Sequence, residues 1–313
     1  MRRGLKIKYS IGIDIGGIMI GTGIVNQKGD LIQRVIVEID TRDRERMFES
    51  VVHAVETLLS QSSIPFEQVY TIGAGVPGKI DHKQGIAVFQ NNLPWRNFPF
   101  VERLQEVFPN KEIVIDNDVY MAAYAEWKAA NLTDETFVYV TISTGISCSI
   151  ISAGEFFRGA GFSGELGLIP VYTPHGAKEV GRLEQHASGQ AIEKYGRQLM
   201  GDSSLTAKKV FEKYYDGDEK AKELMSYITS SIAHGLYAIV SLIDPHKIII
   251  GGSVAAKNRI LLHLVEEKLA DLLIDEQKHI LSNLEISTQD NNQGIIGAGL
   301  RAFHNSNSFV KKS

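Results

Sequence analysis

The chain has 313 residues, a formal net charge of −4 at pH 7, 43% hydrophobic residues and 22% charged residues. This length predicts about two domains, the composition is that of a soluble globular protein, and the slight acidic balance argues against a nucleic-acid-binding surface. The single cysteine, Cys148, excludes an intrachain disulfide and a multi-cysteine zinc site. The first residues lack the apolar core of a signal peptide and no apolar run reaches the roughly 20 residues of a membrane span, so we expect a cytoplasmic protein.

The hydrophobic period changes from strand-like to helix-like and back along the chain. The first part is predicted to contain strands at 8–15, 18–25 and 31–38, a helix at 44–61, strands at 69–75 and 112–115, and a helix at 117–130. The second part is predicted to contain a strand meander from Phe137, helices at 188–195, 207–214 and 219–243, a strand at 247–250, a helix at 258–273, a strand at 284–287 and a helix at 295–303. Strands followed by helices, twice over, indicate an α/β protein with an internal duplication.

Two strand–turn–strand segments, 9–25 and 136–152, look like the same device used twice. Each places a turn of small residues between two apolar strands, with Gly16-Gly17 in the first turn and Thr144-Gly145 in the second. Such turns bring backbone N–H groups close to a bound ligand, and phosphate is the ligand that suits them best. The pair therefore suggests a nucleotide clamp between two related domains.

Asp14 ends the first apolar strand, where its carboxylate would be costly without a partner. The functional interpretation is an acid that holds Mg²⁺ through water beside the phosphates. The structural alternative is a strand-end aspartate that caps a turn.

Asn117-Asp118 follows a buried strand and opens a helix. Both residue types are favoured helix N-caps, which is one interpretation. The other is a general base at a strand end, which accepts the proton of an attacking hydroxyl in phosphoryl transfer. The spacing alone leaves both open.

Two glycine motifs have alternative interpretations. Gly251-Gly252 follows a buried strand, where it is typical of an ordinary αβ unit or of a backbone on which a nucleotide lies. The segment 73–78 matches the dinucleotide pattern G-x-G-x-x-G, but that pattern should open a helix and residues 77–85 are predicted to form a turn and a loop. We therefore reject a nicotinamide-dependent oxidoreductase.

Two carboxylates in the second part, Glu165 and Glu184, stand in glycine-rich contexts. Carboxylates accept paired hydrogen bonds from neighbouring hydroxyls, which suits a sugar. Acids of loops and helix starts are the structural alternative.

Together these motifs resemble the ROK family of sugar kinases and sugar-responsive repressors, from about Ile11 to Ala302. The resemblance rests on the order and spacing of Asp14-x-Gly16-Gly17, Gly75-Val-Pro77-Gly78, Asn92-Leu-Pro-Trp95, Asn117-Asp118, Ser143-Thr144-Gly145, Gly161-Phe-Ser-Gly164-Glu165-Leu-Gly167, Gly181-Arg-Leu-Glu184, Asp244-Pro245 and Gly251-Gly252.

The resemblance implies an actin-like ATPase (ribonuclease H-like) fold, with two duplicated α/β domains around a cleft. We expect residues 1–118 plus 296–313 in a smaller N-terminal domain and 119–295 in a larger C-terminal one. The resemblance also implies an ATP- and Mg²⁺-dependent kinase in which Asp118 is the catalytic base on a hexose hydroxyl, usually the 6-hydroxyl. It places the sugar on Gly78, Asn92, Asn117, Glu165 and Glu184. It places the nucleotide on Asp14, Gly16, Gly17, Thr144, Gly145, Gly251, Gly252 and Ser253, with Asp14 holding Mg²⁺ through water.

The chain departs from the family pattern at several positions. The Thr-Lys that usually follows the first glycine pair is Ile18-Met19, and the glycine-rich second turn of the family reads Ser143-Thr-Gly-Ile-Ser-Cys-Ser149 here. The positions of the family's zinc ligands hold Leu168, His175, Ala177 and Arg182, so no structural zinc is expected. Because the first strand is predicted to start near residue 8, we expect no DNA-binding segment of the kind that the family's repressors carry. A homodimeric sugar kinase is the preferred interpretation, and a catalytically weak or inactive sugar-sensing protein is the alternative.

Overall fold

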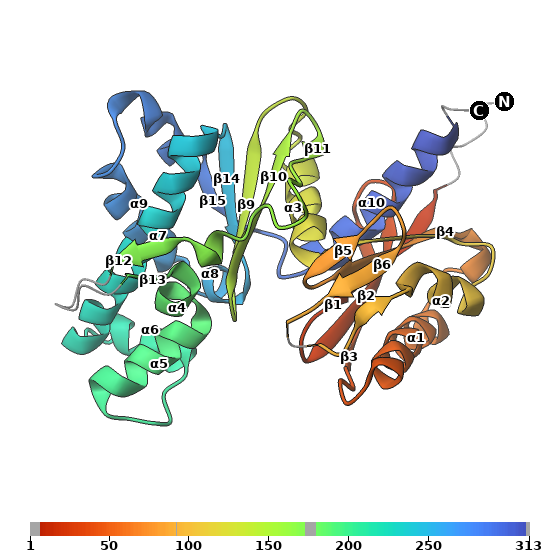
Figure 1. Ribbon diagram of the computed structural model, residues 1–313, viewed down its shortest axis with the longest axis horizontal. Helices are drawn as coiled ribbons and strands as arrows, with labels where there is room; N and C mark the ends of the chain where they lie inside the picture. Colours follow the sequence, from red (N-terminus) through yellow and green to blue (C-terminus); the bar gives the residue numbers. More distant parts are fainter. Residues whose placement is uncertain (1–6, 92, 173–179, 311–313) are drawn as a thin grey trace. The chain divides into compact units, whose positions relative to one another are not determined.

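The computed structural model describes residues 7–91, 93–172 and 180–310 (Figure 1). The chain divides into two compact units, Met1–Asn131 with Asn292–Ser313, and Leu132–Asn291. Helix α3 (Asp118–Ala129) therefore belongs to the first unit, whereas the sequence pattern assigned it to the second domain. The reason is packing, because α3 lies against the C-terminal helix α10 (Gln293–Val310).

The first unit is built on a five-stranded sheet in the order β3-β2-β1-β4-β8. Its strands are β1 Tyr9–Ile15, β2 Met19–Asn26, β3 Leu31–Glu38, β4 Val69–Val76 and β8 Glu112–Asn117. The first three strands form an antiparallel meander, and β1, β4 and β8 run parallel. The further helices of this unit are α1 Arg44–Gln61, η1 Phe66–Gln68 and α2 Phe100–Val107.

The two faces of β1 have different neighbours because side chains alternate along a strand. Ile11 and Ile13 are fully buried in one hydrophobic cluster with residues of α1. On the opposite face, a Cβ at Gly12 would lie 1.9 Å from the carbonyl oxygen of Ile295 in α10. The absence of a side chain at Gly12 thus lets α10 approach the sheet, and the alternation places Asp14 on this same face.

The crossing of α10 and α3 also depends on a glycine, which makes a testable prediction. A Cβ at Gly297 would lie 1.7 Å from the carbonyl oxygen of Met121. We expect Gly297→Ala to lower the free energy of unfolding by about 3 kcal/mol, because the backbone must shift to admit the methyl group. Urea denaturation followed by circular dichroism measures the loss. Gly17→Ala is the control, since a Cβ at Gly17 meets nothing within 4 Å; equal stability of the two variants would contradict the prediction.

A small three-stranded sheet follows β4, and its first strand lies within residues 77–85, where the sequence pattern predicted a turn and a loop. It consists of β5 Lys79–Asp81, β6 Ile86–Phe89 and β7 Arg96–Phe98. These strands are too short to show a hydrophobic period. Trp95 precedes β7; it is fully buried, stacks on Phe98 and donates its indole N–H to the Arg44 carbonyl. Residues 73–76 lie within β4 rather than at the start of a helix, which confirms the rejection of a dinucleotide motif.

The second unit repeats the topology of the first. Its sheet has the order β11-β10-β9-β14-β15, with an antiparallel meander followed by two parallel strands. The strands are β9 Phe137–Ile142, β10 Ile146–Ser152, β11 Glu155–Phe156, β14 Lys247–Gly251 and β15 Leu284–Ile286, and a separate pair is formed by β12 Pro170–Tyr172 and β13 Val180–Arg182. The helices are η2 Leu166–Leu168, α4 Leu183–Ala187, α5 Gly189–Met200, α6 Ala207–Tyr215, α7 Glu219–Ile243, α8 Ser253–Lys257, α9 Ile260–Ala270 and η3 Asp275–Asn283. The matching strand orders confirm the predicted α/β duplication.

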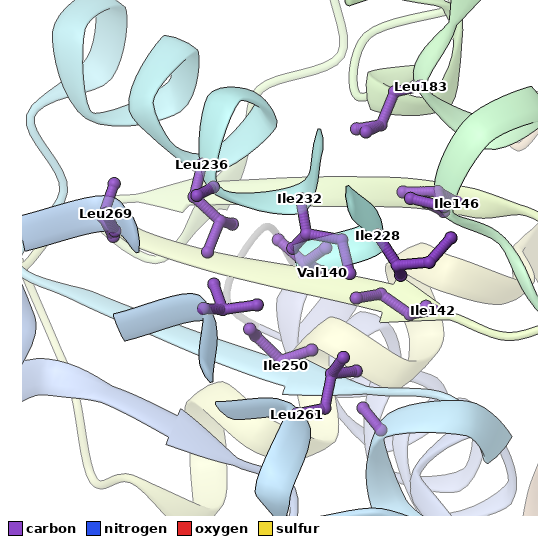
Figure 2. Close-up of a cluster of buried hydrophobic side chains, with 14 of the residues drawn as sticks. Val140, Ile142, Ile146, Leu183, Ile228, Ile232, Leu236, Ile250, Leu261 and Leu269 are labelled. Carbon is purple, nitrogen blue, oxygen red and sulfur yellow. The ribbon is translucent and has the colours of Figure 1, made fainter. Parts of the chain in front are cut away.

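Helix α7 supplies much of the core of the second unit. Figure 2 shows Ile228, Ile232 and Leu236 of this helix in the hydrophobic cluster that includes Val140 of β9 and Ile250 of β14. Among the residues that the structure describes, α7 is the helix long and apolar enough to cross a membrane, with a mean hydropathy of 1.3 over an 18-residue window. More than half of that window, 56%, is buried inside the protein, as in a core helix.

Candidate functional site

The β1–β2 turn carries the first group of predicted site residues. Gly16 donates its N–H to the Met19 carbonyl at 2.9 Å, and Gly17 lies in open space. Ile18 is 77% exposed at the tip of the turn. An apolar side chain thus occupies the tip, and it has no hydroxyl that could donate a hydrogen bond to an anion.

Asp14 lies at the end of β1 and is half-buried. A Cβ at Gly294, in the first turn of α10, would lie 2.4 Å from its carboxyl carbon. Only a glycine therefore lets α10 begin against this carboxylate. Burial and the charge of Asp118 raise the pKa of Asp14 to about 7.

Asn117 is the N-cap of α3, as one interpretation of the sequence expected. Its side-chain oxygen accepts hydrogen bonds from the N–H groups of Val119 and Tyr120, at 2.9 and 3.3 Å. Its amide nitrogen donates to the Gly78 carbonyl at 3.0 Å. Asn117 and Gly78, both predicted to hold the sugar, therefore lie together in the first unit.

Asp118 is the first residue of α3 and is half-buried. A Cβ at Gly75 of β4 would lie 3.2 Å from the Asp118 Cα, so the bare backbone of Gly75 lets the helix start close to the sheet. Gly75 also pairs with Asp14 in the β1–β4 ladder. Gly75 thus lies next to both Asp14 and Asp118, which are 104 positions apart in the sequence. The charges of the two carboxylates interact.

The β9–β10 turn holds Ser143, Thr144 and Gly145 in the second unit. Ser143 accepts the N–H of Gly189 on its carbonyl at 2.7 Å. Its hydroxyl lies 2.9 Å from the hydroxyl of Ser253, so the turn is tied to the start of α8. The sequence predicted both segments for nucleotide binding, and the structure brings them together.

Gly251 and Gly252 have a packing reason of their own. A Cβ at Gly251 would lie 2.3 Å from the Tyr139 hydroxyl oxygen. Gly252 has a φ of +86°, and a Cβ there would lie 2.4 Å from the Ile142 carbonyl oxygen. At both positions the absent side chain thus leaves space for a residue of β9, Tyr139 beside Gly251 and Ile142 beside Gly252.

Glu165 and Glu184 lie close enough for their charges to interact. Burial and the charge of Glu184 raise the pKa of Glu165. The Oε2 atom of Glu184 lies 3.4 Å from a Cβ position at Gly145 and 3.2 Å from one at Gly167. Glu184 is therefore seated beside the β9–β10 turn, which joins the predicted sugar carboxylates to the predicted phosphate turn within one unit.

Gly164 shapes the loop that carries Glu165. Its φ is +93°, and a Cβ would lie 1.9 Å from the Cys148 carbonyl oxygen. Its own carbonyl accepts the N–H groups of Cys148 and Leu166, at 2.7 and 2.6 Å. Burial raises the pKa of the Cys148 thiol to about 12, so this cysteine is unreactive near neutral pH.

Some predicted positions lie outside the described residues. Asn92 is one, and the zinc-motif positions 175 and 177 fall in the segment 173–179. Within the described ranges, no group of three or more His, Cys, Asp or Glu side chains could hold a metal ion. Leu168, at a position where the family pattern has a histidine, is 47% exposed in η2.

Sequence reasoning missed two contacts at these sites. It identified neither Gly294 beside Asp14 nor the hydrogen bond between Ser143 and Ser253. Both join residues more than 100 positions apart, and no local period reports such a contact. A glycine at the start of the predicted C-terminal helix was the available signal for the first.

Comparison with known proteins agrees with these motifs. The glucokinase of Halalkalibacterium halodurans is 25% identical over 97% of this chain and 98% of its own, and the N-acetyl-D-glucosamine kinase of Haemophilus influenzae (strain 86-028NP) is 26% identical over 78% and 84%. A ROK family glucokinase from Streptomyces griseus, solved in complex with glucose and AMPPNP, matches 95% of this chain and 99% of its own with a TM-score of 0.79 and 26% identity. The chain shares the actin-like ATPase fold of these kinases. Because the model of the ROK family matches residues 10–303, nearly its whole length, the protein belongs to that family.

Proposed function

We propose that this chain is a sugar kinase that transfers the γ-phosphoryl group of ATP to the 6-hydroxyl of a hexose or hexose derivative, with Asp118 as general base. The observation that carries the proposal is the pair of carboxylates in the first unit, with Asp118 close enough to raise the pKa of Asp14. Phosphoryl transfer needs one carboxylate for the metal and phosphates and another for the attacking hydroxyl. The relatives named as glucokinase and N-acetyl-D-glucosamine kinase support a sugar as the acceptor.

In the proposed reaction, Asp118 accepts the proton of the sugar hydroxyl. The hydroxyl oxygen forms a bond to the γ-phosphorus while the bond from that phosphorus to the bridging oxygen breaks, and ADP leaves with the electron pair. A half-buried carboxylate at a helix start suits this role, because it is held in place yet remains reachable.

The nucleotide is assigned to residues of both turns. Asp14 would hold Mg²⁺ through water, and its half-buried carboxylate is the kind of oxygen donor that this cation prefers. When bound, the cation neutralises phosphate charge. Gly16, Gly17, Thr144 and Gly145 would offer backbone donors to the phosphates, while Gly251, Gly252 and Ser253 would lie along the adenosine.

The sugar is assigned to Gly78, Asn92, Asn117, Glu165 and Glu184. The paired hydrogen bonds that a carboxylate accepts suit vicinal hydroxyls, and Glu165 and Glu184 supply two neighbouring carboxylates. The amide nitrogen of Asn117 donates one hydrogen to Gly78 and retains a second for a ligand.

The test is the release of ADP from Mg·ATP over a panel of glucose, mannose, N-acetylglucosamine and N-acetylmannosamine. The proposal expects turnover that depends on one of these sugars and that Asp118→Asn lowers by at least about 100-fold. Binding of a sugar, measured by calorimetry, without turnover anywhere on the panel would instead support a sugar-sensing protein.

The sensing alternative is favoured by one observation, the exposed Ile18 at the tip of the β1–β2 turn. If a missing hydroxyl donor slows transfer, Ile18→Thr should raise kcat on the order of 10²-fold, the value of one preorganised donor. Initial rates of ADP release measure the gain. Ile18→Val is the matched control, because valine has the branched shape of threonine without the hydroxyl; equal rates for the two variants would show that the hydroxyl is not what limits this protein.

We also propose that the kinase works in the cytoplasm, and that it is a homodimer, the usual state in the family that it resembles. Sedimentation velocity of the purified chain tests the dimer.

A further inference from the structure

A histidine outside the proposed catalytic set lies at the centre of a polar cluster in the second unit. His186 is 6% exposed on α4, two residues after Glu184. Its Nδ1 atom is hydrogen-bonded to the hydroxyl of Tyr195 in α5, at 3.1 Å, and to the hydroxyl of Tyr227 in α7. Hydrogen bonds to one imidazole nitrogen thus connect α4 to both α5 and α7.

The other side of the ring is equally confined. A Cβ at Gly181 in β13 would lie 2.0 Å from His186 Nε2, so only glycine leaves space for the ring there. The imidazole stacks on Tyr195 with an interplanar angle of 7° and meets Tyr227 edge-on at 87°. These contacts define both the position and the orientation of the ring. Burial and the nearby Lys194 lower the pKa of His186, which favours the neutral ring.

Helix α4 is held in place by contacts with other elements of the second unit. It has five residues, too few for a stable helix on its own, so tertiary contacts must place it. Leu183 provides one contact, because a Cβ at Gly235 of α7 would lie 2.6 Å from its Cδ2 atom. His186 provides the polar contacts, to α5 and α7.

Glu184 and His186 point to different sides of α4, since residues two apart on a helix do not face each other. His186 is buried toward α5 and α7, while the Glu184 carboxylate lies beside Gly145 and Gly167. A small rotation of α4 would therefore move the carboxylate relative to the β9–β10 turn.

We propose that His186 is a positioning residue which, through its hydrogen bonds to Tyr195 and Tyr227, sets the orientation of α4 and so the reach of the Glu184 carboxylate toward the sugar. The inference rests on the proposed function, in which Glu184 binds the sugar.

The experiment measures KM for the sugar, KM for Mg·ATP, kcat and melting temperature in a set of matched variants. His186→Phe keeps an aromatic ring without polar atoms, and His186→Asn keeps a polar atom close to the position of Nδ1. Tyr227→Phe removes one hydroxyl only, so it tests the inference should His186→Phe fail to fold. His234→Phe on the exposed side of α7 and Tyr215→Phe on α6 are the controls, since the His234 and Tyr215 side chains are exposed.

His186→Phe is expected to raise the sugar KM about tenfold, the scale of one lost buried hydrogen bond, with KM for Mg·ATP unchanged. His186→Asn should restore the sugar KM to within about threefold, and adding Tyr227→Phe to His186→Phe should cost little more because both remove the same interaction. A melting temperature that falls while the sugar KM stays constant would overturn the inference, as would equal changes in both KM values.

Glu184→Gln separates this inference from the proposed function. If Glu184→Gln raises the sugar KM and His186→Phe does not, the positioning role of His186 is wrong and the sugar assignment stands. If Glu184→Gln leaves the sugar KM unchanged, the sugar assignment of Glu184 is wrong and the positioning role falls with it.

Discussion

Replacement of Asp118 by Asn is expected to lower kcat by about 10²- to 10⁴-fold while the sugar still binds. The amide keeps the size and position of the carboxylate at the start of α3 but cannot accept a proton, and general-base catalysis contributes a factor of this order. Measurement of kcat by ADP release, together with the sugar dissociation constant by calorimetry, separates chemistry from binding.

The Asp118→Asn experiment needs a matched control and has two outcomes that would contradict the prediction. Asp271→Asn, at the end of α9, is the control because its carboxylate is exposed on the surface of the second unit. A kcat that remains within about twofold of the original in Asp118→Asn would remove Asp118 from the reaction, since a general base cannot be replaced by an amide without cost. Loss of sugar binding in this variant would assign Asp118 to binding instead.

Asp14→Asn is expected to have opposite effects on activity and stability. Activity with Mg·ATP should fall by about 10²- to 10³-fold, because the charge beside the phosphates is lost. In metal-free buffer at pH values above 7, the free energy of unfolding of the variant should exceed that of the original protein. The reason is that the folded variant no longer holds an ionised, desolvated carboxylate next to Asp118.

The sign of the pH dependence follows from the raised pKa of Asp14. In the unfolded chain this carboxyl ionises near pH 4, whereas in the folded protein it keeps its proton up to about pH 7. Between these values the unfolded state binds fewer protons, so the free energy of unfolding decreases as pH rises, and it levels off above pH 7. The stability gain of Asp14→Asn should therefore be small at pH 4 and largest above pH 7. Thermal denaturation of both proteins with EDTA from pH 4 to 8.5 measures it, and a gain that is independent of pH would contradict the assigned shift.

Much of the secondary structure could be predicted because its signals are local. The alternation of β1 and the helical spacing of α1 are both visible in the sequence, and the structure confirms the elements that they predict. Asn117 and Asp118 stand at a strand–helix junction that the pattern located, and the cap was one of its two interpretations. Short strands such as β5 were missed because three residues carry no period.

The unit boundary at α3 could not be predicted in this way. The hydrophobic pattern of α3 is compatible with either unit. Helix α3 belongs to the first unit because α10 packs against it, and Gly297 allows this packing because it leaves room for the Met121 carbonyl. A contact between helices so far apart in sequence depends on the whole unit being folded.

The sequence by itself determined the duplicated α/β pattern, the acids at the strand ends and the departures at Ile18 and Met19, because residue type and period are local properties. Only the tertiary structure decided which side chains act on one another. It brought Asp14 beside Asp118 across the bare backbone of Gly75, and it enclosed His186 between two tyrosines and Gly181. The physical reason is that pKa shifts and side-chain orientation arise from burial and from distances between residues remote in sequence, which exist only once the sheets and helices have packed.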